Sequence, residues 1–314
     1  MSTPLPIIAG VAPSSQTLPA GQWKTVLDFL IEHYPRITCE TWTSRMSKGV
    51  VVDEAGLRLN PASSYRIGAR IFYYRELEHE TRIPFAEVII YQDHDLLVVD
   101  KPHFLPVVPS GRYLQETLLV RLRNQGQPDV LVPVHRLDRE TAGIVLFSLN
   151  PKTRGHYTSL FRERKVRKVY EALTPAISGS CRDLPTTRRS RIVSGEPFFR
   201  MREIPGKPNA ETDLKLLEQE DGFARFELLP RTGKKHQLRV HLAALGIPIL
   251  NDRLYPDEVF VAHSDRQDDF SKPLQLLARS IEFSDPLTGS ERFFESNRRL
   301  GQESKPRITQ IDAD

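Results

Sequence analysis

The stretch HRLDRETAG at residues 135–143 runs directly into the apolar segment IVLFSL at residues 144–149. The apolar segment predicts a buried strand, and the polar residues before it predict a turn. Asp138 stands in that turn between Arg136 and Arg139, whose positive charges would keep its carboxylate ionised beside a ligand. Such a carboxylate suits a nucleophile or a base. The alternative is an ordinary Asp that makes a turn hydrogen bond or a surface ion pair.

A second informative stretch is RTGKKHQLRVHL at residues 231–242, which continues to GIPILND at residues 246–252. Its basic residues are not accompanied by an acid, and they stand where we expect a helix over residues 235–245 to begin. The beginning of a helix already favours anions. The stretch therefore predicts a site for a phosphate or for a catalytic carboxylate.

The helical spacing of this stretch predicts which side chains can reach the same ligand. Lys235, Arg239 and Leu242 would share one face of the helix, and His236 and Val240 would share another. Only some of the polar groups can then point to one site. Taken alone, each histidine of the stretch is predicted to lie on the helix surface or at the edge of the core.

Charge is distributed unevenly along the chain. The 314 residues carry 44 Lys and Arg against 40 Asp and Glu, a formal net charge of +4. Residues 1–100 carry 9 basic and 12 acidic side chains, residues 101–250 carry 26 and 15, and residues 251–314 carry 9 and 13. The middle segment therefore has a net charge of +11. A polyanion such as a nucleic acid is its natural partner, and a solvated basic surface is the alternative.

Composition excludes several classes of protein. The 39% hydrophobic and 8% aromatic residues are sufficient for a folded core. Every apolar stretch is shorter than the ~18 residues that a membrane-spanning helix needs. The N-terminus shows no readable targeting segment, so we expect a cytoplasmic protein that does not bind a membrane. Cys39 and Cys181 stand alone, which predicts two reduced thiols and no metal site.

The pattern of elements predicts two domains between two flexible ends. Residues 1–20 are rich in Pro, Ser and Thr, and residues 296–314 lack a hydrophobic pattern, so we expect both segments to be flexible. Residues 21–80 predict a small α+β domain. Residues 86–295 predict a larger α+β domain with a largely antiparallel sheet, because the short strands are not regularly interleaved with helices.

The strands of the larger domain are predicted at residues 87–91, 96–99, 143–149, 167–173 and 224–229. Its helices are predicted at residues 114–123, 150–164 and 235–245. Asn150 and Pro151 suit the N-cap and the first position of the second helix, and Gly246 suits the end of the third.

Several of these stretches occur in an order that is more specific than any one of them. They are DKP (100–102) through PSG (109–111), HRLDRETAG (135–143), KVY (168–170), GKPNAET (206–212) and RTGKKHQLRVHL through ND (231–252). Together they resemble the NKPxGxxVHP, HRLDxxTSG, KxY, GKxAxT and RTGRxHQIRVHLxxxGxPIxGD motifs of the RluA-type pseudouridine synthases. The resemblance covers about residues 86–290.

The resemblance implies a pseudouridine synthase fold, a largely antiparallel mixed sheet flanked by helices with a central cleft. It implies that Asp138 is the catalytic aspartate, that Tyr170 packs against the uracil and that Arg239 pairs with Asp138. Arg136 would help to fill the space of the flipped-out uridine, and Leu238 would line the base pocket. The matching motifs also contain Lys168, His135 and Thr141, which we expect to contribute to substrate binding.

The implied reaction sets the chemical requirements of the site. Uridine becomes pseudouridine when the glycosidic bond breaks, the uracil turns and its carbon 5 joins the ribose, without redox change or net hydrolysis. We therefore expect no cofactor and no metal. The enzyme needs an ionised carboxylate, a flat wall for the freed uracil and a site closed to water. The target base must be unpaired or extruded from the stack.

Two basic runs accompany the motifs. One lies at residues 152–168 and the other at residues 188–202. Beside a site for RNA they are expected to contact phosphates, which gives affinity without sequence choice, whereas elsewhere they would be solvated surfaces. The residues that we expect to contact the RNA backbone are Arg154, Arg164, Lys165, Arg167, Lys234 and Lys235.

Residues 21–80 resemble, more weakly, the small RNA-binding domain named after ribosomal protein S-four. RMSKGVVV at 45–52 and IGARI at 67–71 carry this resemblance. The acidic balance of the segment argues against strong RNA binding. A domain that only packs or orients the rest of the chain is an equal alternative.

Some positions depart from the family's motifs. His103 and Phe104 replace the small pair usual after Lys-Pro, Asp100 replaces Asn, Ala142 replaces Ser, and Asn251 replaces Gly. The first departure alters a loop near the pocket and leaves the exact substrate open. The others leave every expected catalytic position intact.

We therefore predict an RNA pseudouridine synthase, an isomerase that acts as a monomer on structured rRNA or tRNA. The alternative is a catalytically idle RNA- or ribosome-binding factor on the same fold. The presence of Asp138, Tyr170 and Arg239 together argues against it. A carboxylate-based glycoside or nucleoside hydrolase normally needs two acids beside the bond, whereas the resemblance implies a catalytic role for Asp138 alone.

Overall fold

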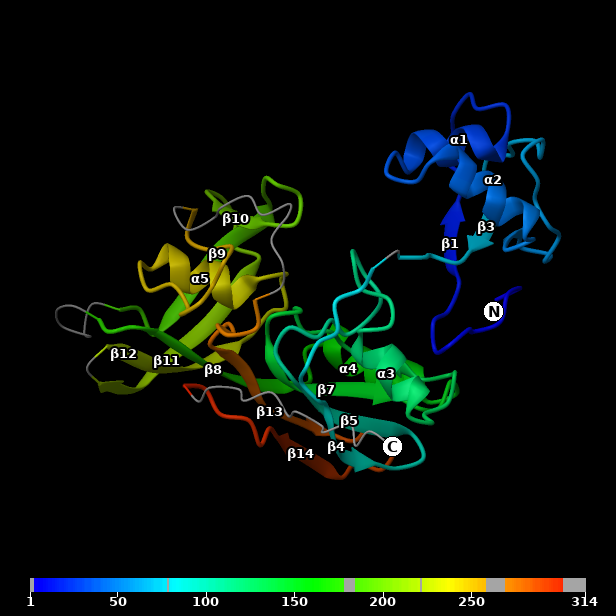
Figure 1. Ribbon diagram of the computed structural model, residues 1–314. Helices are drawn as coiled ribbons and strands as arrows, with labels where there is room; N and C mark the ends of the chain where they lie inside the picture. Colours follow the sequence, from blue (N-terminus) through cyan, green and yellow to red (C-terminus); the bar gives the residue numbers. More distant parts are fainter. Residues whose placement is uncertain (1–2, 78, 178–183, 221, 258–268, 302–314) are drawn as a thin grey trace, which may run out of the picture. The chain divides into compact units, whose positions relative to one another are not determined.

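The computed structural model describes the chain except for residues 1–2, 78, 178–183, 221, 258–268 and 302–314 (Figure 1). Its internal contacts divide the chain into two units. The smaller unit contains Met1–Glu80, Pro109–Gln115 and Val120–Asp129, and the larger unit contains Thr81–Val108, Glu116–Leu119 and Val130–Asp314. Cys39 is an exposed thiol without a disulfide partner, and Cys181 lies outside the described residues.

The smaller unit combines a three-stranded antiparallel sheet with two helices. The elements are β1 (Ser14–Thr17), α1 (Val26–His33), α2 (Cys39–Ser47), β2 (Val51–Asp53) and β3 (Arg70–Tyr73), and the strand order is β1–β3–β2. Both helices bury apolar side chains, Phe29, Leu30 and Trp42 among them, in one core with the sheet. Thr25 begins α1 with a capping box, because its hydroxyl accepts from the Asp28 N–H at 3.1 Å.

The prediction that residues 1–20 form a flexible segment is wrong for its last part. β1 pairs with β3 from Ser14 opposite Tyr73 to Thr17 opposite Arg70, and the following Leu18 is buried. A short polar strand has no apolar alternation to mark it in the sequence, but its backbone can still extend a sheet.

The larger unit contains the strands β4 (Val88–Gln92), β5 (Leu96–Lys101), β6 (Val132–Pro133), β7 (Ala142–Ser148), β8 (Arg167–Pro175), β9 (Thr187–Ser194), β10 (Met201–Ile204), β11 (Ala210–Glu220), β12 (Phe223–Pro230), β13 (Leu276–Ser284) and β14 (Glu291–Glu295). The predicted strands correspond to β4, β5, β7, β8 and β12. The two-residue strand β6 and the strands β9, β10, β11, β13 and β14 were not predicted. Charged residues in the last five of these strands, as in TRRSRIVS of β9, break the alternation that marks a strand.

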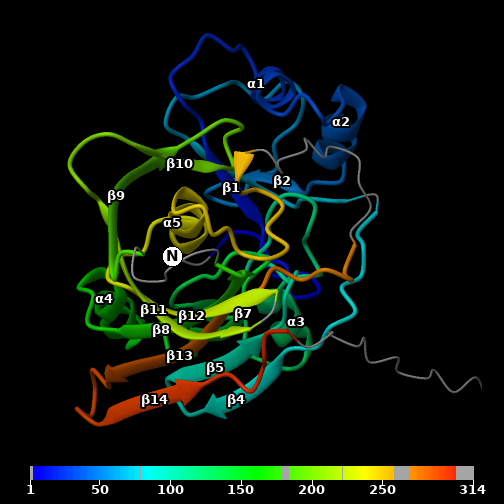
Figure 2. The same ribbon diagram turned by 90° about the vertical axis from the view of Figure 1, so that its left-hand side faces the viewer.

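These strands form one 11-stranded sheet (Figures 1 and 2). The main order is β10–β9–β11–β12–β8–β13–β7–β5–β4, while β14 pairs with β13 and β6 pairs with β7. Neighbouring strands are antiparallel except for β7 and β13, which are parallel. This mixed, largely antiparallel α+β sheet confirms the predicted fold class.

The helices of this region are α3 (Leu118–Asn124), whose residues are divided between the two units, α4 (Arg154–Arg162) and α5 (Gln237–Ala244). α4 buries Tyr157 and Leu160 in a core with β5, β7 and β13. α5 buries Leu238 and Leu242 against β8, β11 and β12, and it lies beside β9 and β10 (Figure 2). The sheet thus includes β7, which follows the HRLDRETAG motif, and supports α5, which contains most of the HQLRVHL segment.

All three predicted helices of this region begin later than predicted, α3 at Leu118 instead of residue 114. α4 does not start at Asn150, because the Asn150 side chain accepts a backbone N–H two residues later at 3.0 Å and forms a turn. α5 does not start at residue 235, because His236 has a left-handed backbone with φ 55°. Gly246, with φ 75°, follows the end of α5 as predicted.

The first residues of the predicted C-terminal tail belong to the larger unit. Asp100, at the end of β5, is buried and accepts hydrogen bonds from the Ser296 hydroxyl at 2.8 and 2.9 Å. Arg298 Nε lies 3.2 Å from the same carboxylate and neutralises the charge that Asp brings to this position. A flexible tail is therefore wrong for residues 296–301, and residues 302–314 lie outside the described residues.

Candidate active site

The turn before β7 holds Asp138 in place. Its backbone carbonyl accepts from the Thr141 N–H at 3.1 Å, and Thr141 is buried. Gly143 follows with φ 112°, and a side-chain carbon there would lie 2.2 Å from the Ala278 carbonyl oxygen of β13. Only glycine fits this close approach. The Asp138 side chain itself is 30% exposed, so a ligand can reach it although its backbone is fixed.

Lys101 supports the same turn from within the protein. Its side chain is fully buried, and its ammonium donates to the carbonyls of Pro102 at 2.9 Å, Leu105 at 2.8 Å and Arg139 at 3.1 Å. Burial lowers the pKa of Lys101 to about 7. Because Arg139 is next to Asp138, the lysine of the DKP motif ties β5 to the turn that carries the candidate catalytic carboxylate.

Arg239 lies between two carboxylates. Its Nε and Nη2 donate to Asp252 at 2.7 and 2.6 Å, and its Nη1 lies 3.8 Å from Asp138 Oδ2. Burial opposes the charge of Arg239, but the hydrogen bonds and charge of Asp252 outweigh burial and raise the pKa of the guanidinium. A permanent cation therefore faces Asp138, and Asp252 fixes its orientation.

His236 is a second group that faces Asp138. Its Nε2 lies 3.8 Å from Asp138 Oδ2, and its side chain is 8% exposed. Burial lowers the pKa of His236 to about 4, so the imidazole is neutral at pH 7. Its Nδ1 lies 2.8 Å from the hydroxyl of Tyr255. The prediction that His236 and Arg239 lie on different faces of one helix is wrong. His236 has a left-handed backbone and precedes α5, so its side chain can face Asp138 together with Arg239.

Tyr170 and Leu238 belong to the same apolar packing between the sheet and α5. Tyr170, in β8, packs against the core cluster to which Leu238 of α5 belongs. Burial, followed by the negative charge of the nearby Asp138, raises the pKa of Tyr170, so its hydroxyl stays protonated. Asp138 therefore lies 3.8 Å from Arg239, and its charge acts on the Tyr170 hydroxyl. The sequence motifs predict this grouping of the three residues.

The other motif residues differ in their environments. The His135 ring stacks on Phe161 with centroids 4.6 Å apart, and its Nε2 accepts from the Leu146 N–H at 3.2 Å. Burial lowers the pKa of His135 to about 3, so the ring is neutral at pH 7. Its stacking on Phe161 and its hydrogen bond to Leu146 are both contacts within the protein. Lys168 is half-buried, and burial lowers its pKa. Arg136 is exposed next to the turn.

The other side of α5 is joined to the sheet by polar groups. Gln237 donates to the Glu211 carbonyl at 2.9 Å and to the Thr212 hydroxyl at 2.8 Å. His241 contacts the Thr212 hydroxyl at 3.0 Å and the Ser190 hydroxyl at 3.1 Å. The motif HQLRVHL therefore has two functions, because His236 and Arg239 face Asp138 while Gln237 and His241 fix the helix to β9 and β11.

Comparisons with known proteins agree with this arrangement. The family described as RNA pseudouridylate synthase matches residues 95–244. An RNA pseudouridine synthase of Synechocystis sp. is 32% identical over 236 residues, which cover 73% of this chain and 79% of that protein. The dual-specificity RNA pseudouridine synthase RluA of Escherichia coli is 34% identical over 216 residues, 67% of this chain and 92% of that protein. The chain belongs to the RluA-type RNA pseudouridine synthases.

Two further relatives extend the comparison. The ribosomal large subunit pseudouridine synthase D of Haemophilus influenzae is 31% identical over 281 residues, 83% of this chain and 82% of that protein. The solved structure of human RNA Pseudouridylate Synthase Domain Containing 1 is 25% identical with a TM-score of 0.54, covering 70% of this chain and 86% of that one. The predicted fold and isomerase function are confirmed, and an idle binding factor gains no support.

In this pseudouridine synthase the basic residues predicted to contact RNA fall into two groups. Some are engaged by the protein: Lys165 pairs with Glu163 at 2.9 Å, Arg167 with Glu282 at 3.0 Å, and Arg154 donates to the Val130 carbonyl at 2.6 Å. Within the described part of the chain, no ion pair or hydrogen bond is found for the side chains of Arg164, Lys234 and Lys235. These last residues are the most available to phosphates.

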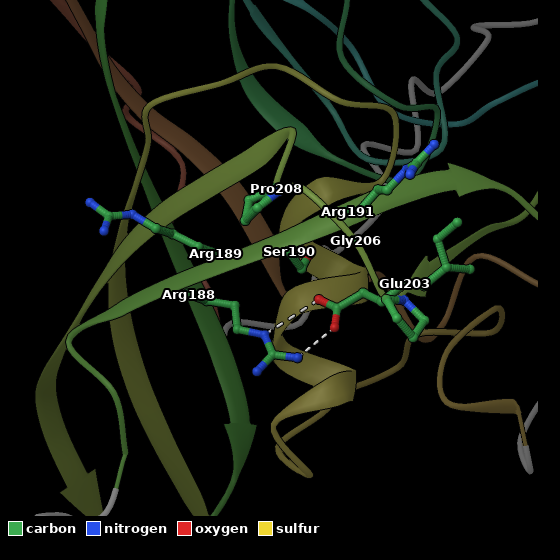
Figure 3. A pocket seen from close by; sticks show the side chains of 9 residues that line it. Arg188, Arg189, Ser190, Arg191, Glu203, Gly206 and Pro208 are labelled. Carbon is green, nitrogen blue, oxygen red and sulfur yellow. Dashed lines mark hydrogen bonds and ion pairs between the residues drawn. The ribbon is translucent and has the colours of Figure 1, made fainter.

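A pocket of about 360 Å³ lies on the hairpin of β9 and β10 (Figure 3). Arg188 is neutralised there by Glu203, to which its Nε donates at 3.4 Å, whereas Arg189 and Arg191 extend away from this pair (Figure 3). The hairpin turn exposes Phe198, 87% of which is accessible to solvent. The pocket does not include Asp138, so it is a separate surface of the pseudouridine synthase.

Sequence reasoning missed several groups of this site. Lys101, Asp252 and Tyr255 were not singled out, and His236 was interpreted as an ordinary histidine. The match of GIPILND to the end of the family's motif was the available signal for Asp252, but no pattern in the sequence indicated the contact between His236 and Tyr255. None of the described helices has the length and apolar character of a membrane span. Across the described residues of the chain, no group of three or more His, Cys, Asp or Glu side chains could bind a metal ion.

Proposed function

We propose that Asp138 is the catalytic carboxylate of this RNA pseudouridine synthase. The observation that carries the proposal is the pairing of an accessible carboxylate with a buried cation, since Asp138 is 30% exposed and Arg239 is 3% exposed at 3.8 Å from it. A carboxylate without such a partner would take up a proton in a site closed to water. Arg239 supplies a fixed positive charge beside the Asp138 carboxylate when bound RNA removes the solvent.

The carboxylate can serve the bond changes of the reaction without a second acid. The bond between uracil N1 and ribose C1′ breaks and a bond between C5 and C1′ forms. The C5 hydrogen leaves as a proton and N1 takes up a proton, so the product is an isomer of uridine. Attack by Asp138 on the nucleoside and removal of a ribose proton by Asp138 both require the same ionised group. Tyr170 and Leu238 would provide the wall against which the detached uracil turns.

Access to the base requires that the uridine leaves the RNA stack, which costs a few kcal/mol. Arg136 is exposed and lies two residues before Asp138. We propose that its guanidinium fills the space that the base leaves and offsets part of the lost stacking. Lys168, His135 and Thr141 stay proposed contributors to substrate binding, with His135 and Thr141 acting through the shape of the turn.

RNA binding is proposed to follow the basic surface of the larger unit. Arg164, Lys234 and Lys235 would contact phosphates most directly, and Arg154, Lys165 and Arg167 would do so by exchanging their present partners. On the β9–β10 hairpin Arg191 would add a phosphate contact, Arg189 would add another by exchanging its present partner Glu211, and the exposed Phe198 would stack on a base.

The substrate class is proposed from the relatives. One is described as acting with dual specificity and another as acting on the ribosomal large subunit. We infer that this chain modifies structured rRNA or tRNA in the cytoplasm. We also propose that it acts as a monomer.

Mapping of pseudouridines by chemical sequencing tests this function. We expect deletion of the protein to remove pseudouridine at one or a few positions of rRNA or tRNA. Expression of the wild-type protein should restore them, whereas Asp138→Ala should not, although it still binds RNA. An unchanged map after deletion would contradict the proposed substrate class.

A further inference from the structure

His236 and Tyr255 form a contact beside the candidate catalytic carboxylate, and the proposed reaction assigns no role to it. The Tyr255 side chain is buried. Its hydroxyl accepts from the Met201 N–H of β10 at 2.8 Å and lies 2.8 Å from His236 Nδ1. Among the described residues these are the only hydrogen-bond partners of the hydroxyl. The backbone of β10 is thus connected through Tyr255 to a ring that faces Asp138.

Proton counting assigns the direction of each hydrogen bond. A phenol has one proton to donate, and the Met201 N–H already occupies one acceptor position of the oxygen. Of the two described partners only His236 Nδ1 can accept the phenol proton, so Tyr255 donates to Nδ1. A neutral imidazole carries one proton, which must then be on Nε2. That nitrogen lies 3.8 Å from Asp138 Oδ2.

The Tyr255 ring is held firmly enough to enforce this orientation. It meets the His236 ring edge to face, with centroids 5.7 Å apart and planes at 80°. The guanidinium carbons of Arg239 and Arg200 lie 5.3 and 5.2 Å from its centroid. Rotation of Tyr255 would break contacts with both cations as well as the Met201 hydrogen bond.

We propose that Tyr255 and His236 are positioning residues for the candidate catalytic carboxylate, with Tyr255 holding His236 in the tautomer whose Nε2–H points at Asp138 Oδ2. Arg239 approaches the same oxygen, so the two donors leave Oδ1 as the oxygen available to uridine. A neutral donor orients the carboxylate without adding a second positive charge, which would weaken it as a base or nucleophile. Catalytic contacts are often longer before substrate binds, as the 3.8 Å separation is. The proposal rests on the proposed function of Asp138.

Kinetics of single and double variants test this role. We expect Tyr255→Phe to lower kcat about 3- to 10-fold, as for one neutral hydrogen bond, and His236→Leu to lower it about 10- to 100-fold, as for a bond to a charged group. RNA affinity should be unchanged. The double variant should match His236→Leu within about 2-fold, because Tyr255 acts through His236. His236→Gln, whose amide nitrogen can replace Nε2, should recover most of kcat.

Tyr91→Phe is the matched control. The Tyr91 hydroxyl also joins two partners, Asp93 at 2.7 Å and Arg292 at 2.8 Å, but on residues outside the site. It should lower thermal stability about as much as Tyr255→Phe while leaving kcat unchanged. Additive effects of Tyr255→Phe and His236→Leu, or an unchanged kcat in both variants, would overturn the positioning role.

Nitrogen NMR of protein labelled with nitrogen-15 histidine gives a readout that does not depend on activity. His236→Gln assigns the His236 signals by their disappearance. We expect the proton on Nε2 in the wild-type protein and a mixture of tautomers in Tyr255→Phe. A proton on Nδ1 in the wild-type protein would overturn the inference. If the wild-type protein formed no pseudouridine, the proposed function would fail while the tautomer result would still stand.

Discussion

Arg239 binds Asp252 at two points, 2.7 and 2.6 Å, and directs its remaining nitrogen towards Asp138 at 3.8 Å. Asp252 is buried, so it is a fixed anchor for the guanidinium. The cation therefore cannot turn away from Asp138 when RNA arrives. The site is organised as two carboxylates on one arginine, in which one carboxylate is inside the protein and the other is accessible.

The first prediction concerns this arginine. Arg239→Met should lower kcat at least about 100-fold while RNA affinity changes less than about 2-fold, because the group interacts with Asp138 rather than with the backbone of RNA. It should also lower the free energy of unfolding by about 3 kcal/mol, because it leaves Asp252 buried and unpaired. Enzyme kinetics, RNA titration and denaturant unfolding measure these quantities.

A double variant separates stability from catalysis. Arg239→Met with Asp252→Leu removes the unpaired charge, so stability should recover while kcat stays low. Recovery of activity together with stability would show that the arginine matters only for folding.

The second prediction concerns the start of β7. Gly143→Ala should destabilise the protein by more than about 2 kcal/mol, because its side-chain carbon would lie 2.2 Å from the Ala278 carbonyl at φ 112°. Gly155→Ala is the control, since nothing lies within 4 Å of a carbon there and Ala favours a helix by about 1 kcal/mol. Denaturant unfolding should give changes of opposite sign. Equal effects would contradict the strain assigned to Gly143.

The third prediction concerns acid. Burial lowers the pKa of His103, His236 and His241 to about 4 and that of His135 to about 3. In the unfolded chain histidine titrates near 6.5, so between about pH 4 and 6.5 the unfolded state binds more protons. Stability should therefore rise with pH through this window and gain nothing more from these groups above about pH 7.

Urea unfolding at a series of pH values measures this dependence. His241→Gln should reduce the slope of unfolding free energy against pH near pH 5 by the amount that corresponds to about one bound proton, about 1.4 kcal/mol per pH unit. If the variant kept the wild-type slope, the burial assigned to His241 would not be controlling its protonation.

The fourth prediction concerns RNA contacts. Arg164→Ala should weaken RNA binding and reduce the slope of log affinity against log salt by about 0.7 to 0.9, as for one phosphate contact. Turnover at saturating RNA should change little. Arg299→Ala is the control, because this exposed arginine lies in the acidic C-terminal segment outside both basic runs. The same loss of slope in both variants would indicate a general charge effect.

The sequence was sufficient for the parts of the fold that local pattern specifies. The apolar run of β7 and the Gly246 stop of α5 are set by burial and by backbone preference, and both were predicted. β9 and β11 are charged strands that form because neighbours offer hydrogen bonds, which no single segment encodes. β1 is similar, since it pairs with β3 across more than fifty residues of chain.

The candidate site shows the same division. Asp138, Tyr170 and Arg239 could be predicted because ordered motifs carry them. His236 was misjudged because its left-handed backbone takes it off the helix that its spacing suggested. Tyr255 was missed because tertiary packing positions its hydroxyl next to His236. The sequence around Tyr255 also has no periodic pattern that would have indicated this contact.

The central claim is that Asp138 acts as a carboxylate in the isomerisation. Joining uracil carbon 5 to the ribose releases the hydrogen on that carbon, so release of tritium from RNA labelled at uridine C5 measures the reaction directly. Purified Asp138→Asn should release no tritium above background while binding RNA and unfolding like the wild-type protein, since Asn keeps the shape but not the charge. Tritium release by Asp138→Asn at a rate near that of the wild-type protein would contradict the account.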